Sequence, residues 1–154
     1  MKTALLRHTD AEVVFFLGDG ISDIEPFLKY DNRRAWFAVL GNCDFRLSLP
    51  NLPTIKKTDE ITLLGKRIVF THGDLYGAKS GLTGLKQLAQ DRSADIVLFG
   101  HTHVPAEEYV SVGDRAVWLF NPGSVGMTYM STPSYGVITL EENKEARLTH
   151  CSLV

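Results

Sequence analysis

One event occurs four times along this 154-residue chain: an apolar run ends at a glycine that stands next to or near Asp, Asn or His. The four runs end in LGDG, LGNCD, FTHGD and FGHTH. The polar residues in these endings are Asp19, Asn42, His72, and the pair His101 and His103. Short apolar runs rich in β-branched and aromatic residues predict buried strands, so the chain is expected to build a sheet whose strands end in similar turns.

The segments between and after these strands complete the fold prediction. Helices alternate with strands in the first two thirds of the chain, and β-hairpins follow. This order predicts an α/β fold, a layered α-β-β-α sandwich of two mixed sheets flanked by helices. Helices are predicted at 1–10, 22–30 and 80–94, buried strands at 13–17, 34–40, 67–71 and 95–99, a loop at 49–53, and hairpins at 59–74, 107–120 and 135–154.

Composition places the chain among ordinary globular proteins, with 44% hydrophobic and 22% charged residues. We expect one domain spanning 1–154. A net charge of −2 gives no reason to expect nucleic acid or an anionic membrane as a partner. No apolar segment reaches the roughly 20 residues of a membrane span. The absence of a readable signal peptide and the presence of only two cysteines predict a cytoplasmic location.

The four polar turns predict a metal site. In open α/β sheets, ligands bind beyond the carboxyl ends of the strands, so the turns are expected to converge. Asp, Asn and His donors without thiolate suit Mn²⁺, Fe, Ni²⁺ or Zn²⁺ better than Ca²⁺ or a Cys-rich structural zinc site. Taken singly, Asp19 and Asn42 suit turns and His72 suits a buried packing position. Their coincidence at four strand ends favours a shared metal. We interpret His8 and His150 as surface or packing residues.

The motifs GDG, GNCD, THGD, GHTHVP and NPGSVG stand in the order found in the calcineurin-like metallophosphoesterase superfamily. The chain most resembles the small bacterial and archaeal phosphodiesterase branch. The resemblance implies that Asp19 bridges two metal ions, that Asn42, His72 and His101 complete one site, and that His103 belongs to the other.

The resemblance also implies the reaction. It is the hydrolysis of a phosphodiester in a phosphorylated small molecule by metal-activated water, with Asn42, His72 and Cys43 as candidate catalytic residues. Mn²⁺ is the expected metal, with Ni²⁺, Fe and Zn²⁺ as alternatives. Two cations about 3.5–4 Å apart can clamp a phosphoryl group between them. Asp44 and Asp74 are candidates to orient the ligating imidazoles.

Cys43 departs from the wider superfamily, in which a His follows the Asn and is thought to protonate the leaving group. A thiol with a pKa near 8.5 is a poor acid at neutral pH, which predicts a preference for substrates with good leaving groups. The other interpretation makes Cys43 a small buried residue of the turn.

The start of the chain departs further. Superfamily members begin with a strand that ends in Asp-x-His and is followed by a helix, and residues 1–10 here already resemble that helix. Two ligands of one metal site, and the strand that carries them, are therefore expected to be absent, leaving open strand edges and apolar surface. A partner chain such as a second copy in a homodimer, closure of the sheet, or a natural start upstream would each account for this. We expect the upstream start, which an in-frame segment encoding an apolar strand with Asp-x-His would support.

Three functions remain open at this stage. The first is a metal-dependent phosphoesterase, with diesters favoured over monoesters. The second is a catalytically degraded scaffold, as in the scaffold subunit of the retromer coat, which shares the fold. The third is a one-metal binding domain for a phosphorylated small molecule. The retained His101 and His103 favour the enzyme.

Overall fold

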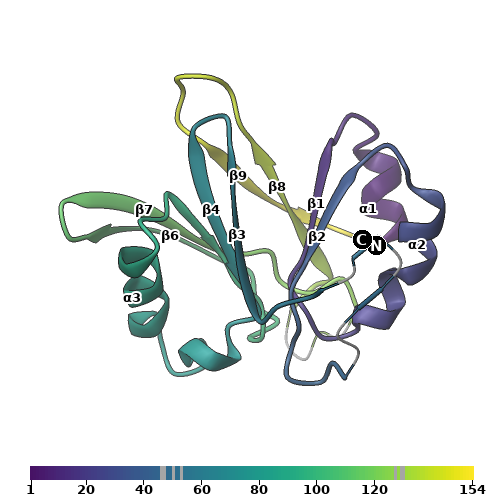
Figure 1. Ribbon diagram of the computed structural model, residues 1–154, viewed down its shortest axis with the longest axis horizontal. Helices are drawn as coiled ribbons and strands as arrows, with labels where there is room; N and C mark the ends of the chain where they lie inside the picture. The colour runs from purple at the N-terminus through teal and green to yellow at the C-terminus, as the bar shows by residue number, and fades with distance from the viewer. Residues whose placement is uncertain (46–47, 50, 53, 127, 129–130) are drawn as a thin grey trace.

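The computed structural model of the chain describes residues 1–45, 48–49, 51–52, 54–126, 128 and 131–154. Helical elements stand before the first strand, between the first and second strands, and between the fourth and fifth strands, and four strands in two hairpins follow the fifth (Figure 1). The helical elements are α1 (Lys2–Arg7), the 3₁₀ turn η1 (Ile21–Ile24), α2 (Glu25–Tyr30), the 3₁₀ turn η2 (Asp74–Tyr76) and α3 (Thr83–Asp91). The strands are β1 (Val13–Phe16), β2 (Ala35–Ala38), β3 (Thr58–Leu63), β4 (Lys66–Thr71), β5 (Ile96–Leu98), β6 (Ala106–Val112), β7 (Arg115–Asn121), β8 (Ser134–Thr139) and β9 (Arg147–Ser152).

Every predicted strand and hairpin forms, but the strands are divided among sheets in a way that differs from the prediction of two mixed sheets. A five-stranded mixed sheet has the order β3-β4-β5-β7-β6. The remaining strands form two separate pairs, the parallel pair β1-β2 and the antiparallel pair β8-β9. The second layer is therefore split, because among the described residues no strand joins β1 to β8.

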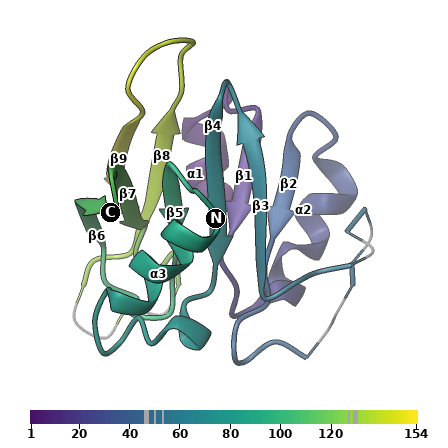
Figure 2. The same cartoon turned by 60° about the vertical axis from the view of Figure 1, so that its left-hand side comes forward.

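Three buried clusters define the layers. One lies between the five-stranded sheet and α3, and contains Leu85 and Leu88 from the helix. A second lies between β1-β2 and the helices α1 and α2. The third lies between the layers, and combines Phe70, Leu98 and Phe120 of the large sheet with Leu148 of β9. The helices thus cover the outer faces and the strands meet in the middle, as the layered prediction required (Figure 2).

The helices are shorter than predicted, and their ends have local causes. The predicted helix at 22–30 divides into η1 and α2, with Pro26 in the first turn of α2, where a missing N–H costs nothing. In the predicted loop at 49–53, Pro50 and Pro53 lie outside the described residues. Among the described residues, no helix combines the length and the hydropathy needed to cross a membrane.

A wide groove separates the two strand pairs. β1 pairs with β2 and β8 pairs with β9, and no other strand of the described residues pairs with either, so that β1 and β8 diverge from each other in Figure 1. The groove has a volume of about 1430 Å³ and is lined by α1, β1, β8 and the turns that follow the central strands. The predicted open edges are therefore present. The prediction of a strand at 13–17 is confirmed, but the prediction that it is buried is wrong, because Val13–Phe16 are all half-buried and lie against this groove.

Candidate metal centre

The turns after β1 and β2 pack directly against each other. A Cβ atom added to Gly18, whose φ is +89°, would lie 2.5 Å from the backbone nitrogen of Gly41. A Cβ atom added to Gly41 would overlap the carboxylate of Asp19. Only glycines permit this approach, which brings Asp19 beside the turn that carries Asn42.

Asp44 holds these two turns together. Its carboxylate accepts hydrogen bonds of 2.8 Å from four backbone amides, those of Asp19, Gly20, Ile21 and Gly41. Burial raises the pKa of the Asp44 carboxyl, but the amide hydrogen bonds outweigh burial and hold its pKa below the ordinary value of 3.8. The expectation that Asp44 orients an imidazole is therefore wrong: it fixes the backbone that presents Asp19.

A backbone carbonyl orients His72. The Nδ1 atom of His72 lies 2.7 Å from the carbonyl oxygen of Leu17, and His72 is 2% exposed. A carbonyl oxygen can only accept, so Nδ1 carries the proton and donates it to Leu17. In the neutral ring this leaves a lone pair on Nε2, which is the state a metal ligand requires.

Three further polar groups converge on Nε2 of His72. His72 Nε2 lies 3.1 Å from His101 Nδ1, 3.2 Å from Asn42 Oδ1 and 3.3 Å from Asp19 Oδ2. The Asn42 and Asp19 oxygens are acceptors, so a proton on Nε2 or a shared cation is needed to join them to it. Donor atoms that share one ion at about 2.0–2.2 Å lie roughly 3–3.5 Å from one another, which matches these spacings. A divalent cation would satisfy all of these lone pairs together.

Three of the seven described non-glycine residues with positive φ lie in the turns that carry the candidate ligands. Asp19, His101 and His103 have φ values of 57°, 66° and 60°, in the left-handed region that non-glycine residues seldom adopt. Such conformations cost about 1–3 kcal/mol each and persist where the surroundings enforce them, often at functional sites. These backbone conformations turn the side chains of Asp19, His101 and His103 toward the same groove.

His101 is held in the neutral form that metal binding needs. Burial lowers its pKa, and the charges of Lys79 and of a protonated His72 lower it further, while Asp74 and Asp19 act in the opposite direction. The net shift of the pKa is downward from 6.5. The ring is therefore neutral and available as a ligand at neutral pH.

Cys43 is exposed, so its interpretation as a buried turn residue is wrong. Its backbone N–H donates to Asp19 Oδ1 at 2.9 Å, and Asn42 Nδ2 lies 3.4 Å from its Sγ. The negative charge of Asp19 is the largest of the causes that raise the pKa of the thiol above 9.0. The thiol is therefore protonated at neutral pH and is a weak acid.

Asp74 does not bond to His72 or His101 in the described part of the chain, contrary to expectation. One of its oxygens lies 3.8 Å from Lys57 Nζ, and the other is buried without a hydrogen-bond partner among the described residues. Lys57 Nζ also donates to the carbonyl of Gly41 at 2.8 Å. Asp74 therefore supports the Asn42 turn through Lys57.

The candidate ligands fit a metal ion in their chemistry and spacing, although they are not spread around a common point. Across the described ranges, no group of three or more His, Cys, Asp or Glu is arranged to hold a metal as it stands. The cluster of Asp19, Asn42, His72 and His101 includes an amide, and its atoms contact one another. Binding would need the side chains of Asp19, His72 and His101 to rearrange around the ion.

His103 lines the same groove as the cluster, and its carbonyl accepts a hydrogen bond from Ser131. The other histidines are packing residues, as expected. His8 Nε2 lies 3.1 Å from the hydroxyl of Tyr135, and the His150 ring stacks on Phe120 at 4.5 Å. The cluster therefore draws on the predicted site residues and on neither of these two.

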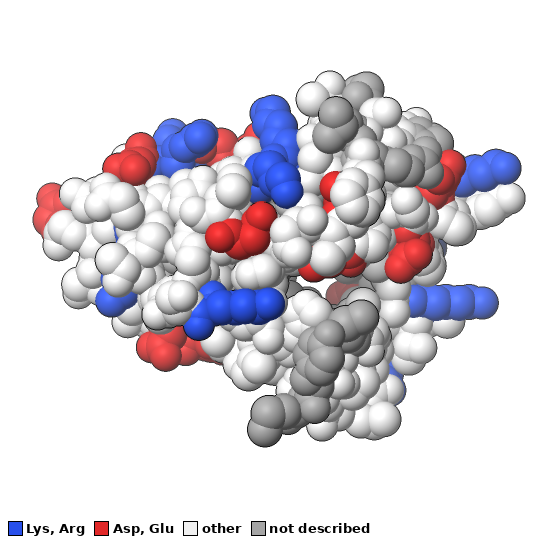
Figure 3. Space-filling model, turned by 90° about the horizontal axis from the view of Figure 1, so that it is seen from below, with Lys and Arg blue, Asp and Glu red and all other residues white. Residues whose placement is uncertain are grey.

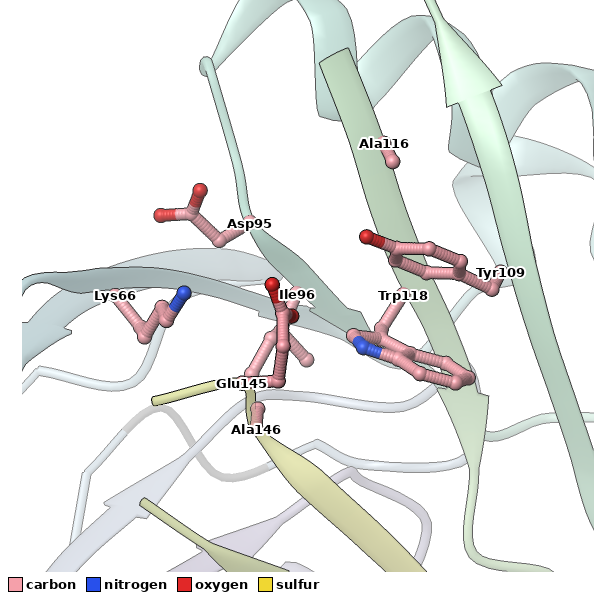
Figure 4. Close-up of a pocket in the computed structure, with 8 residues that line it drawn as sticks. All are labelled: Lys66, Asp95, Ile96, Tyr109, Ala116, Trp118, Glu145 and Ala146. Carbon is pink, nitrogen blue, oxygen red and sulfur yellow. The ribbon is translucent and has the colours of Figure 1, made fainter. Parts of the chain in front are cut away.

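The cluster lies where the groove opens at the carboxyl ends of β1, β4 and β5. Seen from below, this face is hollowed near its middle, with acidic and basic side chains around the hollow (Figure 3). A second pocket of about 100 Å³ lies at the opposite end of the strands and contains none of the predicted site residues. Asp95, Tyr109 and Trp118 line this second pocket (Figure 4), and it is not a candidate active site.

Comparisons with known proteins identify the family. Residues 1–143 match the model of the calcineurin-like phosphoesterase superfamily domain. The chain is 31% identical over 146 residues to "Probable metallophosphoesterase YsnB" of Bacillus subtilis, an alignment that covers 93% of this chain and 78% of that protein. It is 34% identical over 104 residues to "Phosphodiesterase YfcE" of Escherichia coli, covering 66% of this chain but only half, 50%, of YfcE.

A solved structure of Vps29 from Entamoeba histolytica complexed with Zn²⁺ has a TM-score of 0.69 at 18% identity, and covers 99% of this chain and 89% of that one. At this identity the likeness concerns the fold alone. The family uses metal ions, and the site above offers ligands suited to them. From the family match and the sequence relatives together, the chain belongs to the calcineurin-like phosphoesterase superfamily.

Proposed function

We propose that this protein is a metal-dependent phosphodiesterase whose metal is held by Asp19, Asn42, His72 and His101. One observation carries the proposal: Asn42 Oδ1, Asp19 Oδ2 and His101 Nδ1 lie 3.2, 3.3 and 3.1 Å from Nε2 of His72, so donor atoms from four separate turns meet at one place. Mn²⁺ is the metal we favour, with Ni²⁺, Fe and Zn²⁺ sharing the same ligand preferences.

The protein's own residues have separate tasks in this proposal. Leu17 fixes the His72 ring, Asp44 fixes the turn of Asp19, and the Cys43 amide fixes one Asp19 oxygen. A bound divalent cation supplies Lewis acidity to the phosphoryl group and to an attacking water. The protonated thiol of Cys43 lies beside this cluster and is a candidate to meet the leaving group.

The test is hydrolysis of bis(p-nitrophenyl) phosphate with excess Mn²⁺. Asn42→Ala removes one ligand oxygen, and we expect the rate to fall at least about 100-fold. Asn32→Ala is the matched control, because Asn32 is exposed and lies outside the groove. Calorimetric titration with Mn²⁺ should show tight binding in the unsubstituted chain and in Asn32→Ala, and weakened binding in Asn42→Ala.

A scaffold is the second candidate function, because the open edges of β1 and β8 and the apolar groove between them are surfaces that a partner could cover. The fold likeness to Vps29 is compatible with this role. Hydrolysis no faster in the unsubstituted chain than in Asn42→Ala would reject the phosphodiesterase and favour the scaffold.

A further inference from the structure

The groove that contains the metal ligands has an unusual charge pattern. Four carboxylates line it, those of Asp10, Glu12, Asp19 and Asp23. Among the described residues of the lining, Lys79 is the single Lys or Arg. A phosphate ester is an anion, so an acidic groove opposes its entry unless a positive charge meets it.

The backbone places Lys79 beside the ligand cluster. Its neighbour Ala78 donates a backbone hydrogen bond of 3.1 Å to Gly73, the residue after His72. A Cβ atom on Gly73 would lie 3.6 Å from the carbonyl of Gly100, the residue before His101. The loop of Lys79 therefore contacts the two histidine turns. Figure 3 shows basic side chains at the edge of the hollow on this face.

Lys79 is also available, whereas nearby lysines are engaged. Lys57 is bound to the carbonyl of Gly41 and approaches Asp74, and Lys56 pairs with Asp59 at 2.9 Å. Lys79 is exposed and makes no hydrogen bond or ion pair with any other described residue. Its charge acts on the cluster: after burial, it is the next largest cause that lowers the pKa of His101.

We propose that the ammonium group of Lys79 is an anion-binding subsite, which holds a non-bridging oxygen of the substrate phosphate beside the metal ligands. This inference rests on the proposed function, because it assigns the substrate's phosphate to that same site. Lys79 is in this role a binding residue for the ground state and transition state alike, so it lowers KM more than it raises kcat.

The experiment compares Lys79→Met, Lys79→Arg and Lys86→Met in the Mn²⁺-loaded chain. Lys86 lies on α3, exposed and outside the groove, so Lys86→Met makes the same change of charge elsewhere. The dissociation constant of inorganic phosphate is measured by calorimetry, and KM and kcat with bis(p-nitrophenyl) phosphate. In Lys79→Met we expect both the dissociation constant and KM to rise about 5- to 10-fold, with kcat within about threefold. Lys79→Arg should stay within about threefold of the unsubstituted chain, and Lys86→Met should match it.

The measurement of phosphate binding distinguishes the failure of the Lys79 subsite from the failure of the proposed phosphodiesterase activity. If the unsubstituted chain binds phosphate but does not hydrolyse the diester, the phosphodiesterase proposal fails and Lys79 is still judged by the binding constants. Phosphate binding that is equal in Lys79→Met and the unsubstituted chain overturns the subsite. So does a loss confined to kcat, or an unsubstituted chain that binds no phosphate at about 10 mM.

Discussion

The carboxylate of Asp44 is the residue on which the geometry of the site most depends. The pKa of the Asp44 carboxyl is lowered, so the group is ionised at neutral pH. Its two oxygens accept hydrogen bonds from backbone amides of the Asp19 turn and of the Gly41 turn. Because the folded-state pKa lies below the unfolded one, the stabilisation is complete above the unfolded pKa, near 3.9. It is lost as the pH falls through the folded pKa.

Asp44→Asn should therefore destabilise the protein in a pH-dependent way. The amide keeps one acceptor oxygen, loses the charge, and places an NH₂ group against backbone amides. We expect a loss of about 1.5–3 kcal/mol in the free energy of unfolding at pH 7, which shrinks as the pH falls toward 3. Urea denaturation at several pH values measures this. Asp114→Asn, in the exposed turn between β6 and β7, is the control, and an equal loss in both variants would contradict the role assigned to Asp44.

Cys43 governs which leaving groups the protein can expel, if it acts as a phosphodiesterase. Its thiol has a raised pKa because Asp19 is close, so it protonates a leaving oxygen poorly at neutral pH. We expect aryl diesters to be hydrolysed faster than alkyl diesters. Cys43→His introduces a group with a pKa near 6.5 and should raise the alkyl rate by about 10-fold or more while changing the aryl rate less. Steady-state rates on a matched pair of aryl and alkyl diesters measure this. If the ratio of the aryl rate to the alkyl rate is the same in Cys43→His and in the unsubstituted chain, Cys43 does not protonate the leaving group.

At the scale of the elements, the contact between the turns after β1 and β2 is a steric requirement. Gly41→Ala would place a Cβ atom onto the Asp19 carboxylate and backbone. We expect it to displace Asp19, weaken Mn²⁺ binding by at least about 10-fold and lower the unfolding free energy by about 1–3 kcal/mol. Gly126→Ala is the matched control, since no atom of a described residue lies within 4 Å of its Cβ position and its φ is not positive. Calorimetry and denaturant melts measure both effects, and a normal Mn²⁺ affinity in Gly41→Ala would be evidence against the close approach.

The order of elements was predictable because each strand carries its own local signal: a short apolar run and a turn that ends it. The convergence of Asp19, Asn42, His72 and His101 followed from the rule that parallel strands present their carboxyl ends together. Contacts made by backbone atoms could not be foreseen in this way. The Leu17 carbonyl that orients His72 has no sequence signature, because every residue carries one.

Other misses have the same origin. Asp44 was expected beside a histidine, but backbone amides satisfy a carboxylate as well as an imidazole does. Cys43 was interpreted as buried because cysteine usually is, whereas its turn projects it outward. The half-burial of β1 depends on which strand lies beside it, and pairing partners are a property of the whole sheet.

At the scale of the molecule, the layers are uneven. The five-stranded sheet is covered by α3 on one face and by the inner cluster on the other. The opposite layer is divided by the groove, so β1 and β8 each leave one edge that no strand of the described residues pairs with. Unpaired edges flanked by apolar side chains are templates for pairing with another chain.

We therefore expect the isolated chain to self-associate through this groove at micromolar concentration. Val137 lies on β8 and lines the groove, whereas its partner across the hairpin, Thr149 on β9, does not. Val137→Lys places a charge at the open edge and should raise the dissociation constant of the self-association by about 10-fold, because lysine on an edge strand opposes pairing. Thr149→Lys adds the same charge on the other strand of the hairpin and should change it little. Sedimentation velocity over a range of concentrations measures both. A chain that stays monomeric throughout would show that side chains from α1 and the strands shield the edges well enough alone, and equal effects of the two lysines would place the association elsewhere on the hairpin.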